Sequence, residues 1–543
     1  MSNPTWAGSQ RVLLHGGVIY SPVSPFATAM LVDGDTVAWL GEDSAAAAHQ
    51  DSADAIVDLR GALVTPGFVD AHVHTTSTGL TLTGLDLSMT TSLAEMLALL
   101  EKRARLLHGG VILGHGWDET RWADGRPPTR TEVDRASWGS VVYLSRIDVH
   151  SAAVSSALLA AVPGVRDLQG FDPDQPVTQQ AHHAVREAAL ASVTPSQRQE
   201  AQRVARDHAA GLGIVALHEM AGPSISGLDD LGDLTRMSAE ERGPVVYGYW
   251  GELAQQDGIE HARSADAYAV GGDLSVDGAL GSRTACLSSP YLDAPHTHGA
   301  RYLTTEEITE HVVRTTSAGL QAAFHCIGDA ACQSAVDGFV AAAGELGVDR
   351  IRERGHRLEH AEMVSDAAIA SMADLGIIAS MQPMFDALWG NPEGMYERRL
   401  GRDRASAMNR IADLTTAGVA VALGSDSPVT SLGPWGAVRA AMLHHSADQR
   451  VSARAAFSAH TRGGWRAVNR PDAGVLAPGA PAHYALWAVD EVVVQAPDSR
   501  LAAWSTDPRS GTPGLPALAD DAELPECLRT VAFGRTIHDR FED

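Results

Sequence analysis

His72 and His74 are the residues of this 543-residue chain whose type and spacing point most directly to chemistry. They follow the apolar pair Phe68-Val69 and are one residue apart, so an extended chain turns both imidazole rings to the same face. Two imidazoles at the end of a strand suit a metal ion such as zinc. A strand that merely ends in two polar residues would look the same, so the assignment depends on the rest of the chain.

Polar residues follow several other short apolar runs, at positions where strands would end: His218, Glu219, His325, His360 and Asp426. Taken singly, a histidine at a strand end is often a hydrogen-bonded loop residue. An aspartate after Gly-Ser, as at Asp426, is often a helix cap or a turn residue. Taken together with the His-x-His pair, they predict a set of imidazole and carboxylate ligands for a metal.

The segment from about residue 66 to 470 alternates short apolar runs with long helical stretches, including 197–210, 305–318, 333–346 and 366–375. This alternation predicts parallel strands, and its length favours an α/β fold of the (β/α)8 TIM-barrel type. A doubly wound sheet is the alternative, but no GxGxxG motif follows the first strand. In a barrel, the ends of the strands meet at one mouth and bring the polar residues together. Residues about 80–200 exceed one crossover and predict a lid subdomain.

The two ends of the chain contain short strand-like runs separated by turn residues, such as 36–40 near the start and 483–488 near the end. We expect both ends to build one β-sandwich around the inserted barrel. The predicted domains are therefore 1–65 and 471–543 for the sandwich and 66–470 for the barrel.

Composition excludes some classes of function. The net charge of −26 argues against nucleic acid and anionic membrane surfaces as partners. The four cysteines lack CxxC spacing, which disfavours a disulfide framework or a cysteine-rich zinc site. Residues 1–10 do not resemble a signal peptide, and no run of 18 apolar residues occurs. We therefore expect a soluble cytoplasmic protein that acts on small molecules, and a homodimer is compatible with the sequence.

Six motifs, spread over nearly the whole chain, resemble the amidohydrolase superfamily, and in particular its YtcJ-like branch, which includes N-substituted formamide deformylases. The motifs are Gly67–His74, Gly116–Glu119, Asp277–Ala285, His325–Ala330, Arg357–His360 and Gly424–Pro428. The resemblance implies a barrel with a sandwich made from both ends of the chain. It also implies one or two divalent ions, and the chemistry of the ligands favours zinc.

The resemblance assigns a role to each ligand candidate. His72 and His74 would hold the metal with Asp426, while His325 and His360 would complete the site or bind a second ion. A metal there would lower the pKa of a bound water and polarise a carbonyl group. Asp426 would accept the proton of the water and pass it to the leaving nitrogen, with His360 as the second catalytic residue.

The chain departs from this branch at one position. Many members carry a lysine four residues before the Asp-Gly pair, which becomes carbamylated and bridges two metals; Asp273 occupies that position here. The single lysine of the chain, Lys102, lies in a charged amphipathic stretch of the predicted lid. Glu219, expected at the end of the third strand, is the preferred bridging candidate, because the side chain of Asp273 is expected to be too short. A pocket-wall or helix-capping role for Glu219 is equally open.

The same motifs suggest residues that contact substrate: Trp117, Asp118, Arg146, His150 and Arg283. A structural ion pair is the alternative for Arg283. An apolar wall or simple loop packing is open for Met384, Phe385 and Trp389, whereas His182 and His183 are expected on the surface of the lid.

The sequence thus predicts a metal-dependent hydrolase of an amide or N-substituted formamide C–N bond. The same site could instead act on a lactone, an ester, a cyclic imide or an aromatic amine. A non-catalytic scaffold protein is the remaining alternative, which the complete ligand set argues against.

Overall fold

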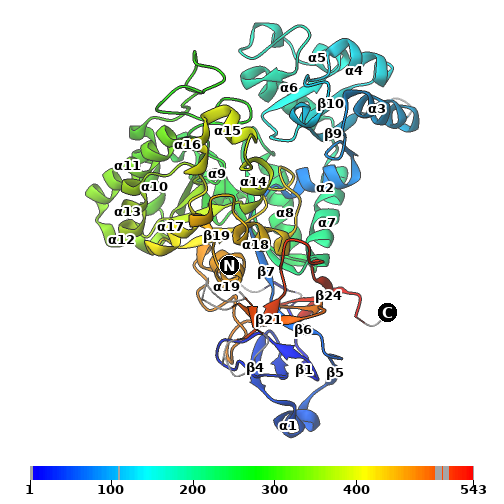
Figure 1. Cartoon of the computed structure of the whole chain (residues 1–543), viewed down its shortest axis with the longest axis vertical. Coiled ribbons are helices and arrows are strands. Elements are labelled where there is room, and N and C mark those ends of the chain that lie inside the picture. The colour runs from blue at the N-terminus through cyan, green and yellow to red at the C-terminus, as the bar shows by residue number, and fades with distance from the viewer. Residues whose placement is uncertain (1–3, 6, 108–110, 496–503, 506–512, 542–543) are drawn as a thin grey trace.

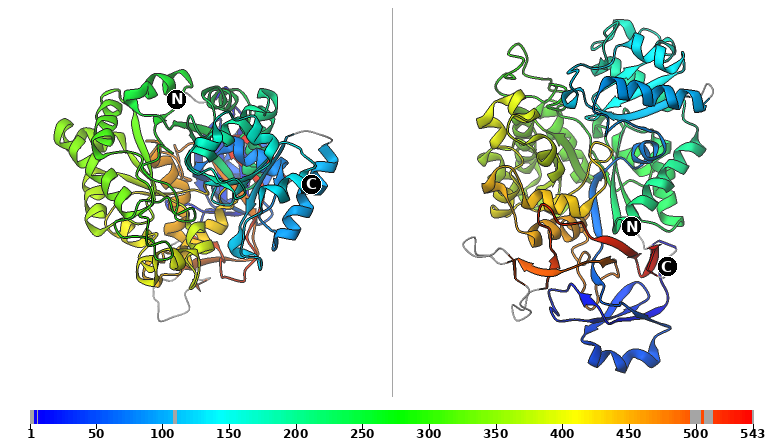
Figure 2. Two further views of the ribbon diagram at one scale, coloured as in Figure 1. Left: turned by 90° about the horizontal axis from the view of Figure 1, so that it is seen from above. Right: turned by 45° about the vertical axis from the view of Figure 1, so that its right-hand side comes forward.

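A computed structural model describes residues 4–5, 7–107, 111–495, 504–505 and 513–541 of the chain. Parts of the predicted 471–543 segment therefore lie outside the described residues, as do residues 1–3 and 6 of the N-terminal stretch. A central barrel is flanked by a lid at one end and by sheets from the two chain ends at the other (Figures 1 and 2). None of the helices described is long and apolar enough to cross a bilayer.

Eight parallel strands form the barrel, in the order β19-β18-β17-β16-β15-β14-β13-β7. Their bounds are β7 Phe68–Val73, β13 Ile214–Ala221, β14 Val245–Trp250, β15 Ala269–Val270, β16 Gln321–Cys326, β17 Arg357–His360, β18 Ile378–Met381 and β19 Val421–Leu423. A parallel bridge between Val73 and Ser427 brings the last strand to the first. Every residue of β7 and β13 is buried, as expected for parallel strands covered on both faces. The predicted barrel is confirmed.

Helices cover the outside of the barrel and border its mouth. They are α7 Pro195–Gly211, α8 Leu228–Glu240, α9 Gly258–Ser264, α10 Thr305–Ser317, α11 Asp329–Leu346, α12 Val348–Arg354, α13 Asp366–Leu375, α14 Pro383–Trp389, α15 Met395–Leu400, α16 Arg402–Ser406, α17 Ile411–Thr416, α18 Pro434–Met442, α19 Ala453–Ser458 and α20 Gly464–Ala467. Several begin at side-chain caps that the sequence encodes. Thr304 and Glu307 form a capping box at the start of α10, and Thr194 does the same for α7 with Gln197.

The lid is a separate sheet with its own helices, inserted between α2 (Thr75–Thr83) and α7. Its strands are β8 Leu85–Asp86, β9 Ile112–Trp117, β10 Val142–Arg146, β11 Ser151–Val154 and β12 Val177–Thr178, and its helices are α3 Leu93–Leu107, α4 Arg130–Ser137, α5 Ser156–Ala160 and α6 Gln179–Ala191. Two short apolar runs that resemble barrel strands in the sequence, 111–113 and 141–144, overlap β9 and β10 and so belong to the lid. Consequently β13, which carries Glu219, is the second barrel strand, and the expected third position was wrong.

Two sheets at the far end share one apolar core. The first contains β4-β3-β1-β5 and the second β2-β6-β20-β24-β25, with bounds β1 Arg11–His15, β2 Val18–Ile19, β3 Ala29–Asp33, β4 Thr36–Gly41, β5 Ala55–Asp58, β6 Leu63–Pro66, β20 Tyr484–Ala488, β24 Glu526–Ala532 and β25 Arg535–Asp539. In the second sheet, β6 pairs with β20, so the two chain ends are joined by backbone hydrogen bonds. The predicted joint structure of the two ends is confirmed, while the domain boundaries at 65 and 470 stay predictions.

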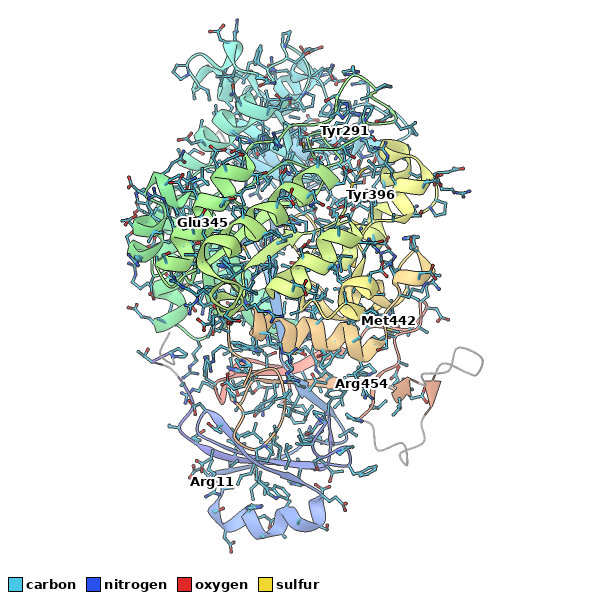
Figure 3. The ribbon with its side chains drawn as sticks, turned by 90° about the vertical axis from the view of Figure 1, so that its left-hand side faces the viewer. Arg11, Tyr291, Glu345, Tyr396, Met442 and Arg454 are labelled. Carbon is cyan, nitrogen blue, oxygen red and sulfur yellow. The ribbon has the colours of Figure 1, made fainter. Side chains whose placement is uncertain are left out.

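Smaller elements complete this end of the molecule. A third sheet contains β21 Val492–Gln495, β22 Trp504–Ser505 and β23 Leu515–Pro516, and α1 spans Asp43–Ala46. Arg11 lies at this end, whereas Tyr396 lies at the end of the barrel that faces the lid (Figure 3). The four cysteines are free, as the sequence predicts.

Candidate metal centre

Four histidines surround two aspartates at the mouth of the barrel. Asp273 Oδ1 lies 3.4 Å from His72 Nε2, 3.5 Å from His325 Nδ1 and 3.8 Å from His360 Nε2. Asp426 Oδ1 lies 3.5 Å from His72 Nε2 and 3.2 Å from His74 Nε2. The strand ends therefore bring together five of the six predicted ligands, His72, His74, His325, His360 and Asp426, together with Asp273.

The backbone at this mouth is shaped for the site. His72 lies within β7, and His74 follows the last residue of that strand. Both rings therefore lie on the same face of the strand, which is the face toward the barrel axis. His360 and Asp426 adopt φ values of 68° and 55°, which non-glycine residues seldom do. Backbone strain of this kind persists where the surrounding structure enforces it, and it clusters at functional sites.

The other ring nitrogen of three histidines has a hydrogen-bond acceptor. The Nδ1 of His72 lies 2.9 Å from Glu359 Oε2, that of His74 lies 2.8 Å from the Met220 carbonyl, and that of His360 lies 2.9 Å from Gln382 Oε1. These partners favour the tautomer in which Nδ1 donates and Nε2 is left with a lone pair. Each Nε2 then faces one or both aspartates and, in the neutral ring, offers a lone pair to a metal ion.

A buried arginine fixes the partner of His72. Arg357 Nη2 donates to Glu359 Oε2 at 2.8 Å and to the Ala71 carbonyl at 2.6 Å. Its other terminal nitrogen lies 2.9 Å from His218 Nδ1. His218 therefore contacts this arginine beneath the site rather than the ligand cluster.

Charge in the cluster is divided between the aspartates and the histidines. Burial raises the pKa of the Asp273 carboxyl, but the neighbouring rings of His72, His325 and His360 outweigh burial and hold that pKa well below its usual range. Burial likewise opposes charge on His72, yet Asp273 and Asp426 raise the pKa of this ring. Both carboxylates are therefore ionised and attract positive charge to the site.

The donor set fits a divalent metal ion. Four buried atoms that face the cluster lack a hydrogen-bond partner, namely His72 Nε2, His360 Nε2, Asp273 Oδ1 and Asp426 Oδ1. Buried polar atoms left without a partner are costly, and divalent cations bound among these atoms would satisfy them. Two groups have ligand atoms within 4.8 Å of one another: His72, His74 and Asp426, and His72, Asp273 and His360.

Asp273, rather than Glu219, is the carboxylate that reaches the histidines. Glu219 Oε2 accepts a 2.7 Å hydrogen bond from the Thr75 backbone, and burial raises the pKa of its carboxyl to about 7. Asp273 follows Gly271 and Gly272, whose φ values are 127° and 81°. This bend carries the backbone so close to the mouth that a short side chain suffices. Asp273 therefore reaches the histidines despite its short side chain, while the choice between Asp273 and Glu219 as the bridging carboxylate stays a prediction.

A cavity opens directly above the cluster, against the lid. Its lining includes Asp118, Arg146 and His150, three of the residues expected to contact substrate. It also includes Phe385 and Trp389, for which an apolar wall and loop packing were both open. Burial lowers the pKa of the His150 ring to about 4. Glu362 and Tyr396 line the cavity as well and were missed, although Glu362 follows the His360 motif by only two residues.

Other predicted residues lie elsewhere. Trp117 is buried in the lid core, and its Nε1 donates to the Leu144 carbonyl at 2.8 Å. Arg283 is half-exposed and forms an ion pair with Asp293 at 2.7 Å, as in the structural alternative to substrate contact. His182 is buried against the Tyr143 hydroxyl at 2.9 Å, so its expected surface position was wrong, whereas His183 is exposed. Met384 is not among the lining residues.

This fold and this ligand cluster define a metal-dependent hydrolase built on a barrel. The model of the amidohydrolase family matches residues 55–538, and the chain belongs to that family. The chain is 28% identical to YtcJ of Bacillus subtilis (strain 168), over 73% of this chain and 76% of that protein. It is 24% identical to the N-substituted formamide deformylase of Arthrobacter pascens, over 75% and 78%. The crystal structure of an uncharacterized metal-dependent hydrolase from Pyrococcus furiosus matches with a TM-score of 0.69 and 27% identity, covering 88% of this chain and 98% of that one.

Proposed function

We propose that this hydrolase cleaves the C–N bond of a small amide, with N-substituted formamides as the leading class. The observation that carries the proposal is the position of Asp426. Its Oδ1 is buried, has no hydrogen-bond partner and lies beside His72 and His74 at the floor of the cavity. The name of the Arthrobacter pascens relative supports the substrate class.

The residues that would hold an ion are His72, His74 and Asp426, with His325, His360 and Asp273 available for a second ion. Imidazole and carboxylate donors suit zinc. A divalent ion bound there supplies Lewis-acid activation of water and of the substrate carbonyl. The chain supplies the proton transfer: Asp426 accepts a proton from the attacking water and returns it to the leaving nitrogen.

The cavity walls would orient the substrate. Phe385 and Trp389 offer apolar contact, and burial keeps His150 neutral at pH 7 so that it can donate or accept a hydrogen bond. The lid elements that carry Asp118 and Arg146 cover the mouth and would limit access of bulk water.

The test joins metal analysis to a substrate panel. Purified protein is assayed for bound metals and for kcat/KM on N-substituted formamides and amides, with matched esters, lactones, cyclic imides and aromatic amines as competitors. We expect zinc and the highest kcat/KM on an amide or formamide. Turnover confined to esters, lactones or amine release would contradict the bond assignment, and a metal-free, inactive protein would support a non-catalytic scaffold.

A further inference from the structure

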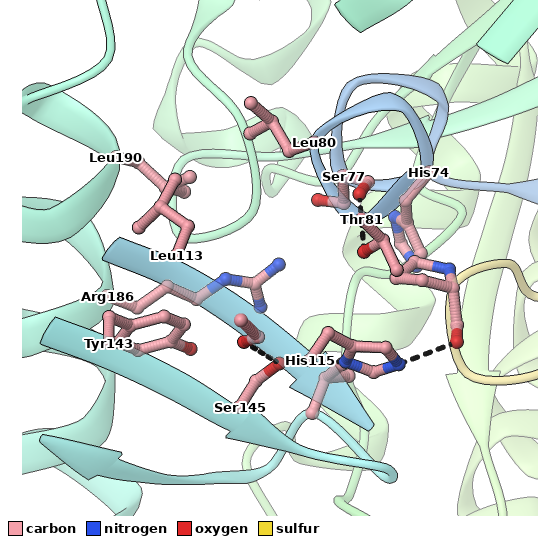
Figure 4. Close-up of a pocket in the computed structure, with 13 residues that line it drawn as sticks. His74, Ser77, Leu80, Thr81, Leu113, His115, Tyr143, Ser145, Arg186 and Leu190 are labelled. Carbon is pink, nitrogen blue, oxygen red and sulfur yellow. Dashed lines mark hydrogen bonds between the residues drawn. The ribbon is translucent and has the colours of Figure 1, made fainter. Parts of the chain in front are cut away.

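A second cavity adjoins the metal centre, between α2 and the lid (Figure 4). We call it the side pocket. It shares His74 and Val149 with the cavity above the metal centre, which we call the substrate cavity. Most of its wall is apolar, with Leu80 from α2, Leu113 from β9 and Leu190 from α6. A substrate held at the metal centre therefore has a second direction in which it can extend.

Arg186, on α6, introduces a positive charge into this apolar wall. Its side chain is half-buried, and Figure 4 shows the guanidinium group pointing toward the interior of the pocket. Among the residues that the structure describes, no carboxylate pairs with it. A partly desolvated cation without a partner is costly, so the position favours an anionic ligand.

The ring and hydroxyl groups of His115, Ser145 and Tyr143 in the wall already have hydrogen-bond partners. His115 lies 2.7 Å from the Pro428 carbonyl through Nε2 and 2.8 Å from Ser145 Oγ through Nδ1, and burial lowers the pKa of its ring to about 4. The Tyr143 hydroxyl bonds to His182. Apart from the metal-centre ring of His74, Arg186 is therefore the source of charge in the pocket.

The substrate cavity has the opposite electrostatic character. Its arginine, Arg146, lies 3.0 Å from Asp118, 2.9 Å from Glu119 and 3.0 Å from Asp148. Three carboxylates surround one guanidinium group, so no positive charge is left over. Away from the metal centre, that cavity therefore offers no unpaired cation to a negatively charged group on a substrate, whereas the side pocket offers Arg186.

We propose that the side pocket binds an apolar arm of the substrate that ends in a carboxylate, with Arg186 as the anchor of that carboxylate. A planar guanidinium group can hold a carboxylate with two parallel hydrogen bonds. The inference rests on the proposed function, because the arm must extend from a carbonyl group held near His74. For an N-substituted formamide, the arm is the substituent on nitrogen, as in an N-formyl ω-amino acid.

The kinetic test measures charge preference rather than activity alone. N-formyl ω-amino acids of increasing chain length are compared with N-alkylformamides of equal length, and the ratio of the two kcat/KM values is determined. We expect the ratio to fall by roughly tenfold or more in Arg186→Gln, the loss typical of a charge-assisted hydrogen bond. In Arg186→Glu, substrates with an ammonium-terminated arm should be preferred instead.

Arg135→Gln is the matched control, because Arg135 is an exposed lid arginine on α4 that lines neither cavity. Its ratio should equal that of the wild type. An unchanged ratio in Arg186→Gln, or an equal fall in both variants, would overturn the inference. Hydrolysis of formamides without charge preference would overturn it and leave the proposed function intact.

A binding measurement separates the inference from turnover. Hexanoate is titrated into the metal-loaded wild type, Arg186→Gln and Arg135→Gln, and Kd is measured by calorimetry. We expect Kd to rise roughly tenfold or more in Arg186→Gln alone. Equal affinity in all three proteins would overturn the inference even if amides are hydrolysed. Weakened binding in Arg186→Gln without hydrolysis of any amide would instead refute the proposed function and retain the carboxylate site.

Discussion

At the scale of single residues, Asp426 is the side chain on which the proposed chemistry depends. Its carboxylate faces the site, whereas an amide in its place could not accept a proton. We expect Asp426→Asn to lower kcat by a factor of about 10²–10⁴, the range for loss of a general acid–base group. Metal content, measured on the same samples, should be retained. Near-normal kcat with metal present would exclude Asp426 as the proton acceptor.

The two carboxylates proposed to bridge metals can be separated by metal content. Asp273 lies within 3.8 Å of four histidine nitrogens, whereas Glu219 accepts a hydrogen bond from Thr75. We therefore expect Asp273→Asn to lower the bound metal per chain and Glu219→Gln to change it much less. Elemental analysis after purification at one fixed metal concentration measures both. The reverse order would restore Glu219 as the bridging residue.

The sequence predicted most of the ligands because each follows a buried apolar run, and the run itself is visible. Asp273 lacked that signal. Its strand, β15, contains only Ala269 and Val270, and the approach to the metal centre is made by Gly271 and Gly272. A Cβ on Gly271 would lie 2.0 Å from the Ala323 carbonyl oxygen. Glycine-dependent backbone approach of this kind cannot be read from hydrophobic patterning.

At the scale of secondary-structure elements, α2 connects the metal centre to the lid and packs against α7. Gly79 makes this contact, since a Cβ there would lie close to the Ala201 carbonyl oxygen of α7. We expect Gly79→Ala to destabilise the fold by about 1–3 kcal/mol through overpacking. Because α2 begins directly after His74, metal affinity should also fall. Urea unfolding and metal competition measure the two effects.

Gly344 in α11 is the matched control. It is exposed, and nothing lies within 4 Å of a Cβ placed on it. Gly344→Ala should stabilise the protein by about 0.4–1 kcal/mol, because alanine restricts the unfolded chain. Equal effects of the two substitutions would show that α2 does not pack tightly on α7.

His356 should make stability depend on pH. It accepts a hydrogen bond from the Ala322 backbone at 2.9 Å and contacts Thr316 of α10. Burial lowers the pKa of its ring to about 3, so between pH 6.5 and 3 the unfolded chain binds a proton that the folded chain does not. Stability from this group is therefore full above pH 6.5 and is lost as pH falls.

We expect the unfolding free energy of the wild type to fall with decreasing pH more steeply than that of His356→Gln. The difference approaches one proton, or about 1.4 kcal/mol per pH unit. Urea unfolding at several pH values between 6.5 and 4.5 measures both slopes. Parallel curves would indicate that His356 titrates alike in the folded and unfolded chains.

The elements themselves were largely predictable. The predicted helix 366–375 matches α13, and 305–318 matches α10 within one residue. The strand number expected for Glu219 was wrong because β9 and β10 have the same apolar character as barrel strands. Only tertiary pairing, in which β10 joins β9 and β11 of the lid, separates them from the barrel.

At the scale of the whole molecule, the single lysine of the chain lies in the lid, whereas a bridging carbamate requires a lysine at the metal centre. Lys102 is exposed on α3 of the lid and belongs to neither ligand group. We expect Lys102→Arg to leave metal content and kcat unchanged, measured against the wild type. Loss of metal in this variant would show that a lysine carbamate takes part after all.

The same lysine gives the molecule a single ε-amino group, placed on the lid. The barrel carries one accessible thiol. Three of the four cysteines are buried, whereas Cys286, in the loop between β15 and α10, is partly exposed. Once the α-amino group of the chain has been blocked, an amine-reactive donor dye and a thiol-reactive acceptor dye would each couple at one native position. Energy transfer between them would report, without any engineered residue, how far the lid moves from the barrel during turnover.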